Sequence, residues 1–184
     1  MNSFHAHELA PQKFLPVGIA ILVVSDSRTL ETDRSGKLLE EGFSKAGHQV
    51  LERVIVPDEK ERIAQQVNAW VQEEKIQCLV VTGGTGVTSR DITPEAIEPL
   101  YDKHLPGFGE LFRQLSFEEI GAACIQSRAT GGLIQGRPIF VIPGSSGACR
   151  LALASILLPQ LDIRTKPCSF PGLWKTCGKP GKTS

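Results

Sequence analysis

The sequence lacks an excess of charge of either sign, a long hydrophobic run and a closely spaced pair of cysteines. Its 184 residues include 20 basic and 20 acidic side chains, so the formal net charge is zero. Broad electrostatic attraction to nucleic acid or to an anionic membrane is therefore not expected. The longest apolar run covers residues 17–24, which is far short of the roughly 20 residues that span a bilayer. Any anion site has to be built from local groups.

Cysteine and histidine usage predicts neither a disulfide framework nor a zinc site. The five cysteines include no C-x-x-C pair, and the four histidines show no metal-ligand spacing. An odd number of thiols without such spacing predicts free cysteines in a reducing compartment, so we expect a cytoplasmic protein. A bridge between Cys168 and Cys177 is the alternative, and a pair of reduced thiols is the favoured interpretation.

Short apolar runs alternate with amphipathic segments along the chain. Strand followed by helix is typical of an α/β fold with a doubly wound, mostly parallel sheet and helices on both faces. One domain is expected at 16–170, between tails at 1–15 and 171–184. The Pro-, Gly- and Lys-rich C-terminal segment is expected to run along the surface or fray, and docking through Phe170 and Trp174 is the alternative. Strands are predicted at 17–25, 49–56, 78–82 and 139–142, and helices at 34–47, 59–74, from Thr93 as N-cap, around 108–115, at 121–128 and at 148–158.

Small, hydroxylic and acidic residues follow four of the predicted strands. In an open parallel sheet, ligands bind outside the carboxyl ends of the strands. Because four strand ends carry the same kinds of residue, we expect one anion site along this edge. The residues after the strands are Ser25, Asp26 and Ser27; Asp58; Thr82, Gly83, Gly84, Thr85 and Gly86, then Arg90 and Asp91; and Pro143, Gly144, Ser145 and Ser146.

These segments suit a phosphate-bearing ligand. Three glycines within residues 82–86 let backbone N–H groups approach an anion closely. The turn at 143–147 leads into a helix N-terminus, which favours negative charge, and Arg90 can neutralise phosphate directly. Asp58 and Asp91 are carboxylates among phosphate-binding parts, which predicts that they hold Mg²⁺ bridging to nucleotide phosphates.

Each of these residues also has a purely structural interpretation, and these alternatives stay open from the sequence. Glycines after a strand often make only a tight turn. Asp58 suits a cap for the next helix, and Asp91 suits an Asx turn before Thr93. Ser145 or Ser146 suits a helix N-cap.

Two familiar phosphate-binding motifs are excluded, and a third enzyme motif has little support. The sequence contains no G-x-x-x-x-G-K-[ST], so it is not a P-loop enzyme. Residues 84–89 nearly match G-x-G-x-x-G, but they follow the third strand and lack an immediate helix, which argues against a dehydrogenase. No histidine falls at a predicted strand end, so a Ser-His-Asp hydrolase has little support.

The T-G-G-T-G segment at 82–86 and the R-D-x-T-P-E segment at 90–95 carry a specific resemblance. Together they resemble the molybdenum cofactor biosynthesis family, whose molybdopterin-binding domain also occurs in molybdopterin adenylyltransferases and gephyrin-like proteins. The likeness covers roughly residues 17–170, and the segment at 159–170 is most similar to the B-type members.

The resemblance implies a three-layer α/β/α fold and homo-oligomers, either trimers or hexamers. It implies binding of molybdopterin and, in the enzymes of the family, transfer of AMP from Mg·ATP to the molybdopterin phosphate with release of pyrophosphate. The acidic positions that this reaction needs match Asp58 and Asp91, and the phosphate-binding loops match 83–86 and 144–146. A non-catalytic protein that binds or carries molybdopterin or a nucleotide on the same fold is the alternative.

Overall fold

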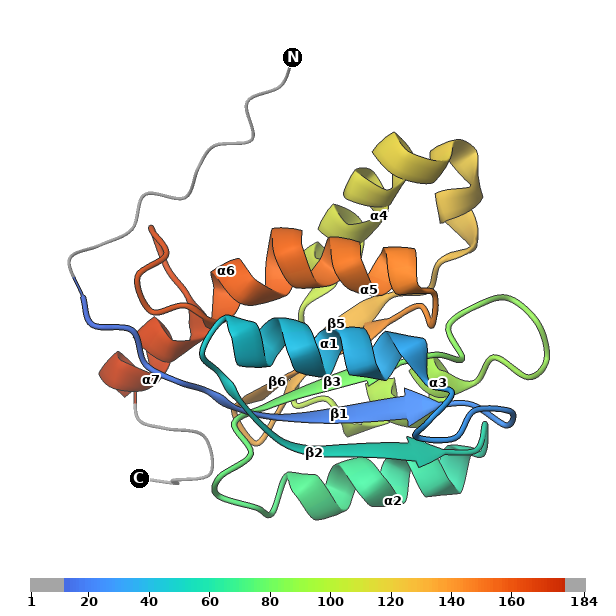
Figure 1. The fold of residues 1–184 in the computed structure, drawn as a ribbon, viewed down its shortest axis with the longest axis horizontal. Helices are drawn as coiled ribbons and strands as arrows, with labels where there is room; N and C mark the ends of the chain where they lie inside the picture. Colours follow the sequence, from blue (N-terminus) through green and yellow to red (C-terminus); the bar gives the residue numbers. More distant parts are fainter. Residues whose placement is uncertain (1–11, 178–184) are drawn as a thin grey trace.

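Six strands form one mixed sheet in the order β2-β1-β3-β6-β5-β4 in the computed structural model, which describes residues 12–177 (Figure 1). The first four strands in this order run parallel, β5 is antiparallel to β6, and β4 is antiparallel to β5. The doubly wound, mostly parallel α/β sheet expected from the sequence is therefore confirmed. The strands are β1 (Gly18–Val24), β2 (Gln49–Val56), β3 (Cys78–Thr82), β4 (Lys103–His104), β5 (Thr130–Ile134) and β6 (Arg137–Ile142).

The register of the parallel strands aligns their carboxyl ends. Val24 at the end of β1 pairs with Val56 at the end of β2, and Thr82 at the end of β3 pairs with Ile142 at the end of β6. Every residue of β1, β3 and β6 is buried, as expected for apolar strands that are covered on both faces. The loops that follow these strands therefore emerge side by side at one edge.

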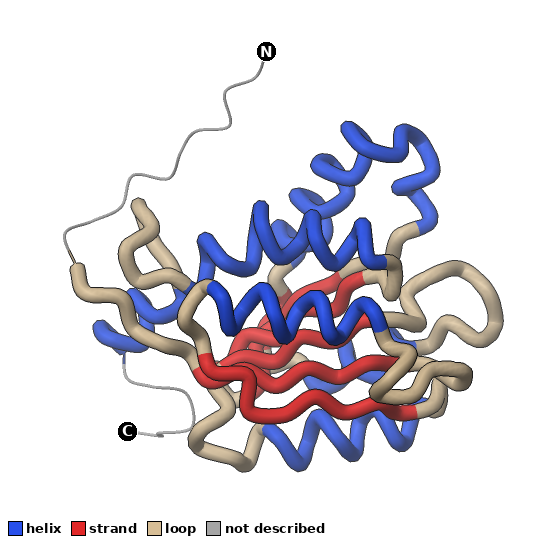
Figure 2. Tube along the Cα trace, in the orientation of Figure 1, coloured by secondary structure: helices blue, strands red, loops and turns tan. Residues whose placement is uncertain are grey.

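Helices cover both faces of the sheet and make three layers, which Figure 2 shows as a red sheet between blue helices. One apolar core packs α1, α4 and the α5–α6 segment on the sheet, and a second core packs α2 and α3 on the opposite face. The helices are α1 (Arg34–Lys45), α2 (Lys60–Trp70), α3 (Thr93–Ile97), α4 (Pro106–Ile120), α5 (Ser146–Ala152), α6 (Leu158–Leu161) and α7 (Phe170–Cys177).

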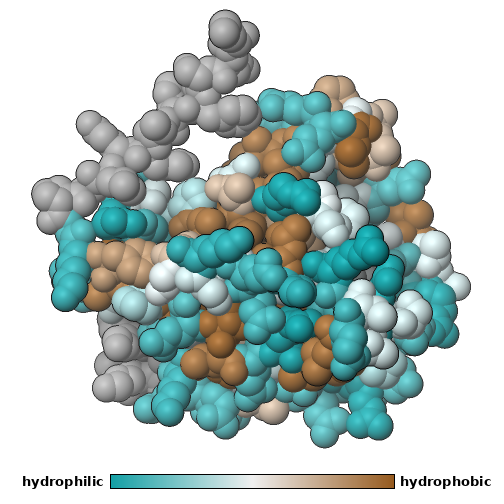
Figure 3. Space-filling view, viewed as in Figure 1, coloured by the Kyte–Doolittle hydropathy of each residue, from teal (hydrophilic) through white to brown (hydrophobic). Residues whose placement is uncertain are grey.

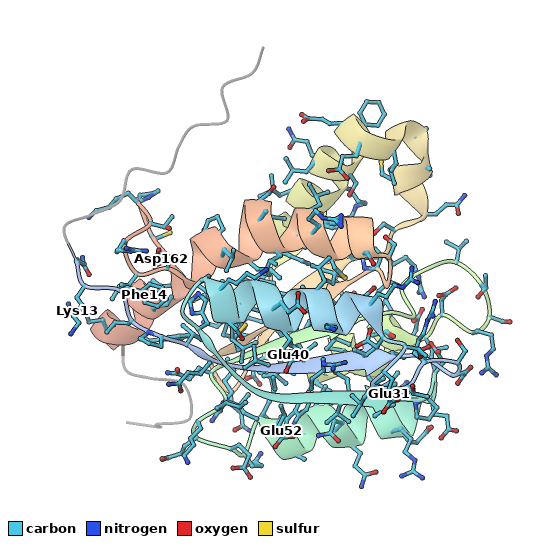
Figure 4. All side chains as sticks on the ribbon, in the orientation of Figure 1. Lys13, Phe14, Glu31, Glu40, Glu52 and Asp162 are labelled. Carbon is cyan, nitrogen blue, oxygen red and sulfur yellow. The ribbon has the colours of Figure 1, made fainter. Side chains whose placement is uncertain are left out.

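The N-terminal segment and the C-terminal part of the chain meet at the amino ends of the strands. Phe14 lies beside Asp162, far from Glu31 at the other end of the molecule (Figure 4). The Phe14 ring packs on His48 with centroids 5.1 Å apart and the ring planes tilted by 55°, and the Arg164 guanidinium lies 5.2 Å from the centroid of the Phe14 ring. Residues 1–11 and 178–184 of the two expected tails lie outside the described residues.

Most of the expected elements are present, with shifted ends. The helix expected at 148–158 begins at Ser146 and continues through a π-helical turn to Leu161. The short helix expected at 121–128 is a 3-10 helix, Gly121–Gln126. Thr93 is not an N-cap, since Ile92 takes that position, and the Thr93 side chain is fully buried.

The C-terminal segment forms helix α7, although the sequence favoured a surface tail. The side chains of Phe170 and Trp174 pack against the core that α1, α4 and α5 share, so the docking that Trp174 indicated is present. Cys78, Cys124, Cys149 and Cys168 are free thiols, in agreement with the expectation for these four residues. Within the described residues, no helix is long and apolar enough to cross a membrane.

Strands β4 and β5 were not predicted, and two of the five β5 residues are glycines. A Cβ at Gly132 would lie 2.3 Å from the Tyr101 ring, so the close packing of this ring on the β5 backbone requires glycine. The β5–β6 hairpin turns at Gln135 and Gly136, whose φ angles are 50° and 75°. Two positive φ angles are typical of a type I′ turn.

We expect Gln135→Asn to stabilise the protein. Asparagine tolerates a positive φ better than glutamine, and Asn-Gly is the preferred pair for this turn, so the free energy of unfolding should rise by about 0.5–1 kcal/mol. Urea denaturation measures the change. Gln135→Val is the matched control and should lower the free energy of unfolding, because a β-branched residue is strained at positive φ. Equal stability of the two variants would contradict the role of this turn.

Candidate functional site

The loop after β3 lies directly against the loop after β6. Gly83 has a φ of 106°, and a Cβ at this position would lie only 2.2 Å from the carbonyl oxygen of Val24. A Cβ at Gly144 would in turn lie 3.2 Å from the Gly83 Cα. The Thr82 hydroxyl donates to the Pro143 carbonyl at 3.1 Å and joins the two loops. Gly83 is therefore needed for the backbone approach, which a simple tight turn would not require, and Gly144 leaves little room for a side chain.

Both predicted carboxylates lie against the T-G-G-T-G loop. A Cβ at Gly84 would lie 2.8 Å from Asp58 Oδ1, and a Cβ at Gly86 would lie 2.8 Å from Asp91 Oδ2. Burial raises the pKa of the Asp58 carboxyl, and the negative charge of Asp91 raises it further. The structure thus brings together two carboxylates from different strand ends, at a distance where the charge of Asp91 acts on Asp58.

The carboxylate of Asp91 is fixed in its ionised form. Its Oδ2 atom accepts hydrogen bonds from the Thr88 hydroxyl at 2.6 Å and from the Thr88 backbone N–H at 3.0 Å. These bonds lower the pKa of Asp91, and the positive charge of Arg128 contributes in the same direction. The Asx turn before Thr93 that the sequence allowed is not formed, because these bonds run back to Thr88.

The carboxylate of Asp58 does not cap a helix. Glu59 is the N-cap of α2, and α2 begins at Lys60 without a side-chain cap bond. The Asp58 backbone N–H donates to Asp26 Oδ1 at 3.1 Å, whereas its own carboxylate accepts no hydrogen bond from the residues described. A half-buried carboxylate with a raised pKa beside a second carboxylate is suited to neutralisation by a cation.

The donor set fits a cation that arrives with a phosphate ligand. Across residues 12–177, no three His, Cys, Asp or Glu side chains are grouped so that they could hold a metal ion alone. Mg²⁺ commonly keeps several waters and is bound through one or two carboxylates together with substrate phosphates. Asp58 and Asp91 provide two such carboxylates beside a glycine-rich loop.

Asp26 connects the loops that follow three strands. It forms an ion pair with Arg90 from the loop after β3 and accepts the backbone N–H of Asp58 from the loop after β2. Ser25 Oγ accepts the backbone N–H groups of Ser27 and Arg28, each at 3.3 Å, and shapes the loop after β1. Arg90, expected to face phosphate, is engaged with Asp26 here, so its predicted role stays a prediction.

Ser145 is the N-cap of α5, as one alternative from the sequence had it. Its hydroxyl accepts the Ala148 backbone N–H at 3.2 Å, and Ser146 is the first helical residue. The Ser35 hydroxyl donates to the Gly144 carbonyl at 2.6 Å and holds the turn before the helix. Capping and ligand binding are compatible, because Ser145 also lines both cavities described next.

Two cavities lie on either side of a shared wall. The first has a volume of about 370 Å³, and the second has a volume of about 320 Å³. Gly83, Gly144 and Ser145 line both of them. The first cavity also includes Gly84, Thr85, Gly86, Asp91, Phe112, Ser116, Ile120 and Ala123, and the second includes Ser25, Arg28, Asp33, Arg34, Ser35, Thr82 and Ser146.

The two cavities differ in chemistry. Phe112, Ile120 and Ala123 give the first cavity an apolar side, which suits a planar ring. Arg28 and Arg34 give the second cavity positive charge, which suits an anionic group. Asp58 lines neither cavity and reaches the site at Gly84.

Sequence reasoning missed Arg128, which holds the loop after β3 from the β5 side. Its Nε donates to the Gly86 carbonyl at 2.7 Å, and its Nη2 donates to the Asp91 carbonyl at 2.5 Å. The same guanidinium pairs with Glu95, and the backbone N–H donates to Thr85 at 3.1 Å. Arg128 fell at the end of a segment predicted as helix, so no pattern pointed to this contact.

Removing each carboxylate should have a different effect on stability. Asp91→Ala loses two hydrogen bonds, so its free energy of unfolding should fall by about 1–2 kcal/mol at pH 7 without divalent cations. Asp58→Ala should change the same quantity by less than about 0.5 kcal/mol or raise it, since an unfavourable charge is removed. Urea denaturation checks both variants.

The pH dependence gives the control for this pair. Because the folded pKa of Asp91 is lowered, its contribution is present at neutral pH and disappears as the pH falls through that pKa. Because the folded pKa of Asp58 is raised, its ionisation costs stability as the pH rises from the ordinary carboxyl value through the raised one. Equal destabilisation by the two alanine variants at pH 7 would contradict this assignment.

Comparison with known proteins agrees with this geometry. Residues 20–163 match the family described as "Probable molybdopterin binding domain". The chain is 48% identical over 158 residues to molybdenum cofactor biosynthesis protein B of Escherichia coli (strain K12), covering 86% of this chain and 93% of that protein. It is 49% identical over 142 residues to the protein of the same name from Bacillus subtilis (strain 168), covering 77% and 84%.

A solved structure has the same fold and a similar sequence. It is a crystal structure of a molybdenum cofactor biosynthesis protein B, with a TM-score of 0.80 and 48% identity, covering 82% of this chain and 94% of that chain. The family match spans the strands and loops that build both cavities, from β1 to the segment after α6. This chain therefore belongs to the molybdopterin-binding domain family, among its B-type molybdenum cofactor biosynthesis proteins.

Proposed function

We propose that this chain acts in molybdenum cofactor biosynthesis, where it binds molybdopterin and adenylylates it with Mg·ATP, releasing pyrophosphate. The relatives named above support the pathway. The observation that carries the reaction is the pair of cavities that share Gly83, Gly144 and Ser145 as a wall. A reaction between two bound substrates needs two adjoining sites, and this wall is where their reacting groups would meet.

The proposed step is displacement at the ATP α-phosphorus. An oxygen of the molybdopterin phosphate forms a new P–O bond to this atom, the bond to the β-phosphate breaks, and pyrophosphate leaves with the bonding electrons. We assign binding of the phosphate oxygens to the backbone N–H groups of Gly84 and Thr85 and to those at the start of α5, since the Gly83 N–H already donates to the Ile142 carbonyl. Such preorganised donors stabilise charge that develops during the reaction.

Asp58 and Asp91 are the residues that would hold Mg²⁺. When bound, the cation neutralises phosphate charge and orients the groups that react. The hydrogen bonds from Thr88 fix the Asp91 carboxylate before any ligand binds. Asp58 has a raised pKa and no comparable bond among the described side chains, so a cation would favour its ionised form.

A binding or carrier protein on the same fold is the second candidate. Arg90 pairs with Asp26, and Asp58 lines neither cavity, so two of the expected groups are not turned toward a ligand. A carrier needs only the cavities and the phosphate-binding loops, all of which are present. The two candidates differ in whether pyrophosphate is released.

We also propose that the protein forms trimers or hexamers and works in the cytoplasm. Large apolar side chains are exposed on α4 and the following 3-10 helix: Leu111, Phe117, Ile120 and Ile125. Figure 3 shows brown atoms on the projection that these two helices form. Exposed apolar groups of this kind commonly mark protein–protein contacts. The four free thiols fit a reducing compartment.

Incubation of the protein with molybdopterin, ATP and Mg²⁺ tests the proposed reaction directly. We expect pyrophosphate release that requires all three components, followed with a coupled pyrophosphatase assay. Omission of molybdopterin is the control for ATP hydrolysis. Molybdopterin binding without any pyrophosphate would favour the carrier function and contradict adenylyl transfer.

Asp91→Asn should slow turnover by about several hundred-fold, because one preorganised contact in the reaction is lost. The amide oxygen can still accept the Thr88 bonds, so the variant should fold and bind molybdopterin as the unmodified protein does. Steady-state rates and molybdopterin fluorescence quenching separate these two effects. Unchanged turnover in this variant would end the assignment of Asp91 to the reaction.

A further inference from the structure

The hydroxyl of Thr93 is buried beneath the site and has no partner. Thr93 is 0% exposed, and its Oγ1 atom makes no hydrogen bond within the part of the chain that the structure describes. A buried hydroxyl without a partner costs free energy, because its bonds to water are lost on folding. Such a group at a functional site calls for a specific explanation.

Helix capping does not explain this hydroxyl. Thr93 is the first residue of α3, and the N-cap position belongs to Ile92, which makes no side-chain cap bond. The Thr93 backbone N–H donates to the Gly84 carbonyl at 3.0 Å, which holds the residue against the loop after β3. The side chain is therefore placed by the loop that it contacts.

Thr93 Oγ1 and Asp58 Oδ1 lie against the same side of Gly84. A Cβ added at Gly84 would lie 2.3 Å from Thr93 Oγ1 and 2.8 Å from Asp58 Oδ1. Glycine at this position thus leaves the space that a Cβ would fill open between a donor and an acceptor. The Asp58 carboxylate has no bond from another described side chain that would fix its orientation.

We propose that Thr93 is a positioning residue whose hydroxyl donates to Asp58 Oδ1 when ligand binds, which leaves the second carboxylate oxygen facing the cation. This inference rests on the proposed function, because it assigns Asp58 to a cation that accompanies a nucleotide. Hydrogen bonds to a carboxylate are stronger than those between neutral groups. Groups that bond to a metal ligand from behind orient it, and their loss typically lowers metal affinity or activity 10–100-fold.

The test compares Mn²⁺ binding by variants with and without the hydroxyl. Thr93→Val keeps the shape of the side chain and removes the donor, whereas Thr93→Ser keeps the donor. The signal of free Mn²⁺ in electron paramagnetic resonance reports Mn²⁺ affinity in the presence of α,β-methylene-ATP, which cannot be cleaved at the α–β position. We expect about 10-fold or greater loss of affinity in Thr93→Val and a change of less than about twofold in Thr93→Ser.

Ser169→Ala is the matched control for loss of a buried, unpartnered hydroxyl. Ser169 is 2% exposed, and its Oγ makes no hydrogen bond with the residues described, but it precedes α7 at the opposite end of the sheet (Figure 1). Mn²⁺ affinity should be unchanged in this variant. Melting temperatures of all variants separate loss of binding from loss of structure. Thr93→Ala is a second variant without the hydroxyl, to be used if Thr93→Val does not fold.

The outcomes distinguish this inference from the proposed function. Wild-type affinity in a folded Thr93→Val or Thr93→Ala variant, equal losses in the Ser and Val variants, or an equal loss in Ser169→Ala would each overturn the role of Thr93. A wild-type protein that binds Mn²⁺ with the nucleotide analogue but never releases pyrophosphate would overturn adenylyl transfer and leave the Thr93 comparison standing. No Mn²⁺ binding by the wild-type protein would overturn both.

Discussion

The close backbone approach at Gly83 is the constraint on which the rest of the site depends. With a φ of 106° and the Val24 carbonyl where a Cβ would stand, this residue brings the end of β3 against the end of β1. The nearness of Gly144 to the same residue brings in the end of β6. A side chain at Gly83 would push apart loops that share the walls of two cavities, and a side chain at Gly144 would press on Gly83. The shape of the site at the carboxyl ends of the strands therefore depends on glycine at positions 83 and 144.

The two carboxylates beside these glycine loops differ in how the protein stabilises their charge. Asp91 is bonded by Thr88 and lies near Arg128, so its carboxylate is stable in ionised form. Asp58 is half-buried near a like charge and has a raised pKa. Asp91 is thus ionised and oriented before a ligand binds, whereas ionisation of Asp58 is unfavourable until a positive charge lies beside it. This asymmetry fits a site that binds a cation together with its phosphate ligand.

The sequence predicted the parts of the fold that have a simple local signal. The apolar runs at residues 78–82 and 139–142 became central strands because burial on both faces leaves no polar position. The site residues followed from them, since strand ends in parallel register must meet at one edge. Strand β5 had no such signal: glycine lowers strand propensity, and its turn has Gln135 where asparagine is usual. Arg128 was missed with it, because its contacts depend on where β5 begins.

The wall of Gly83, Gly144 and Ser145 that the two cavities share has a thermodynamic consequence. Thr82 and Pro143 are bonded across this wall, so a displacement of one loop moves the other. If a ligand in one cavity shifts this shared wall, it changes the free energy of ligand binding in the other cavity. Linkage requires the effect to be reciprocal, with the same factor whichever molecule enters first. Two ligands bound in the two cavities would therefore be coupled through the loops after β3 and β6.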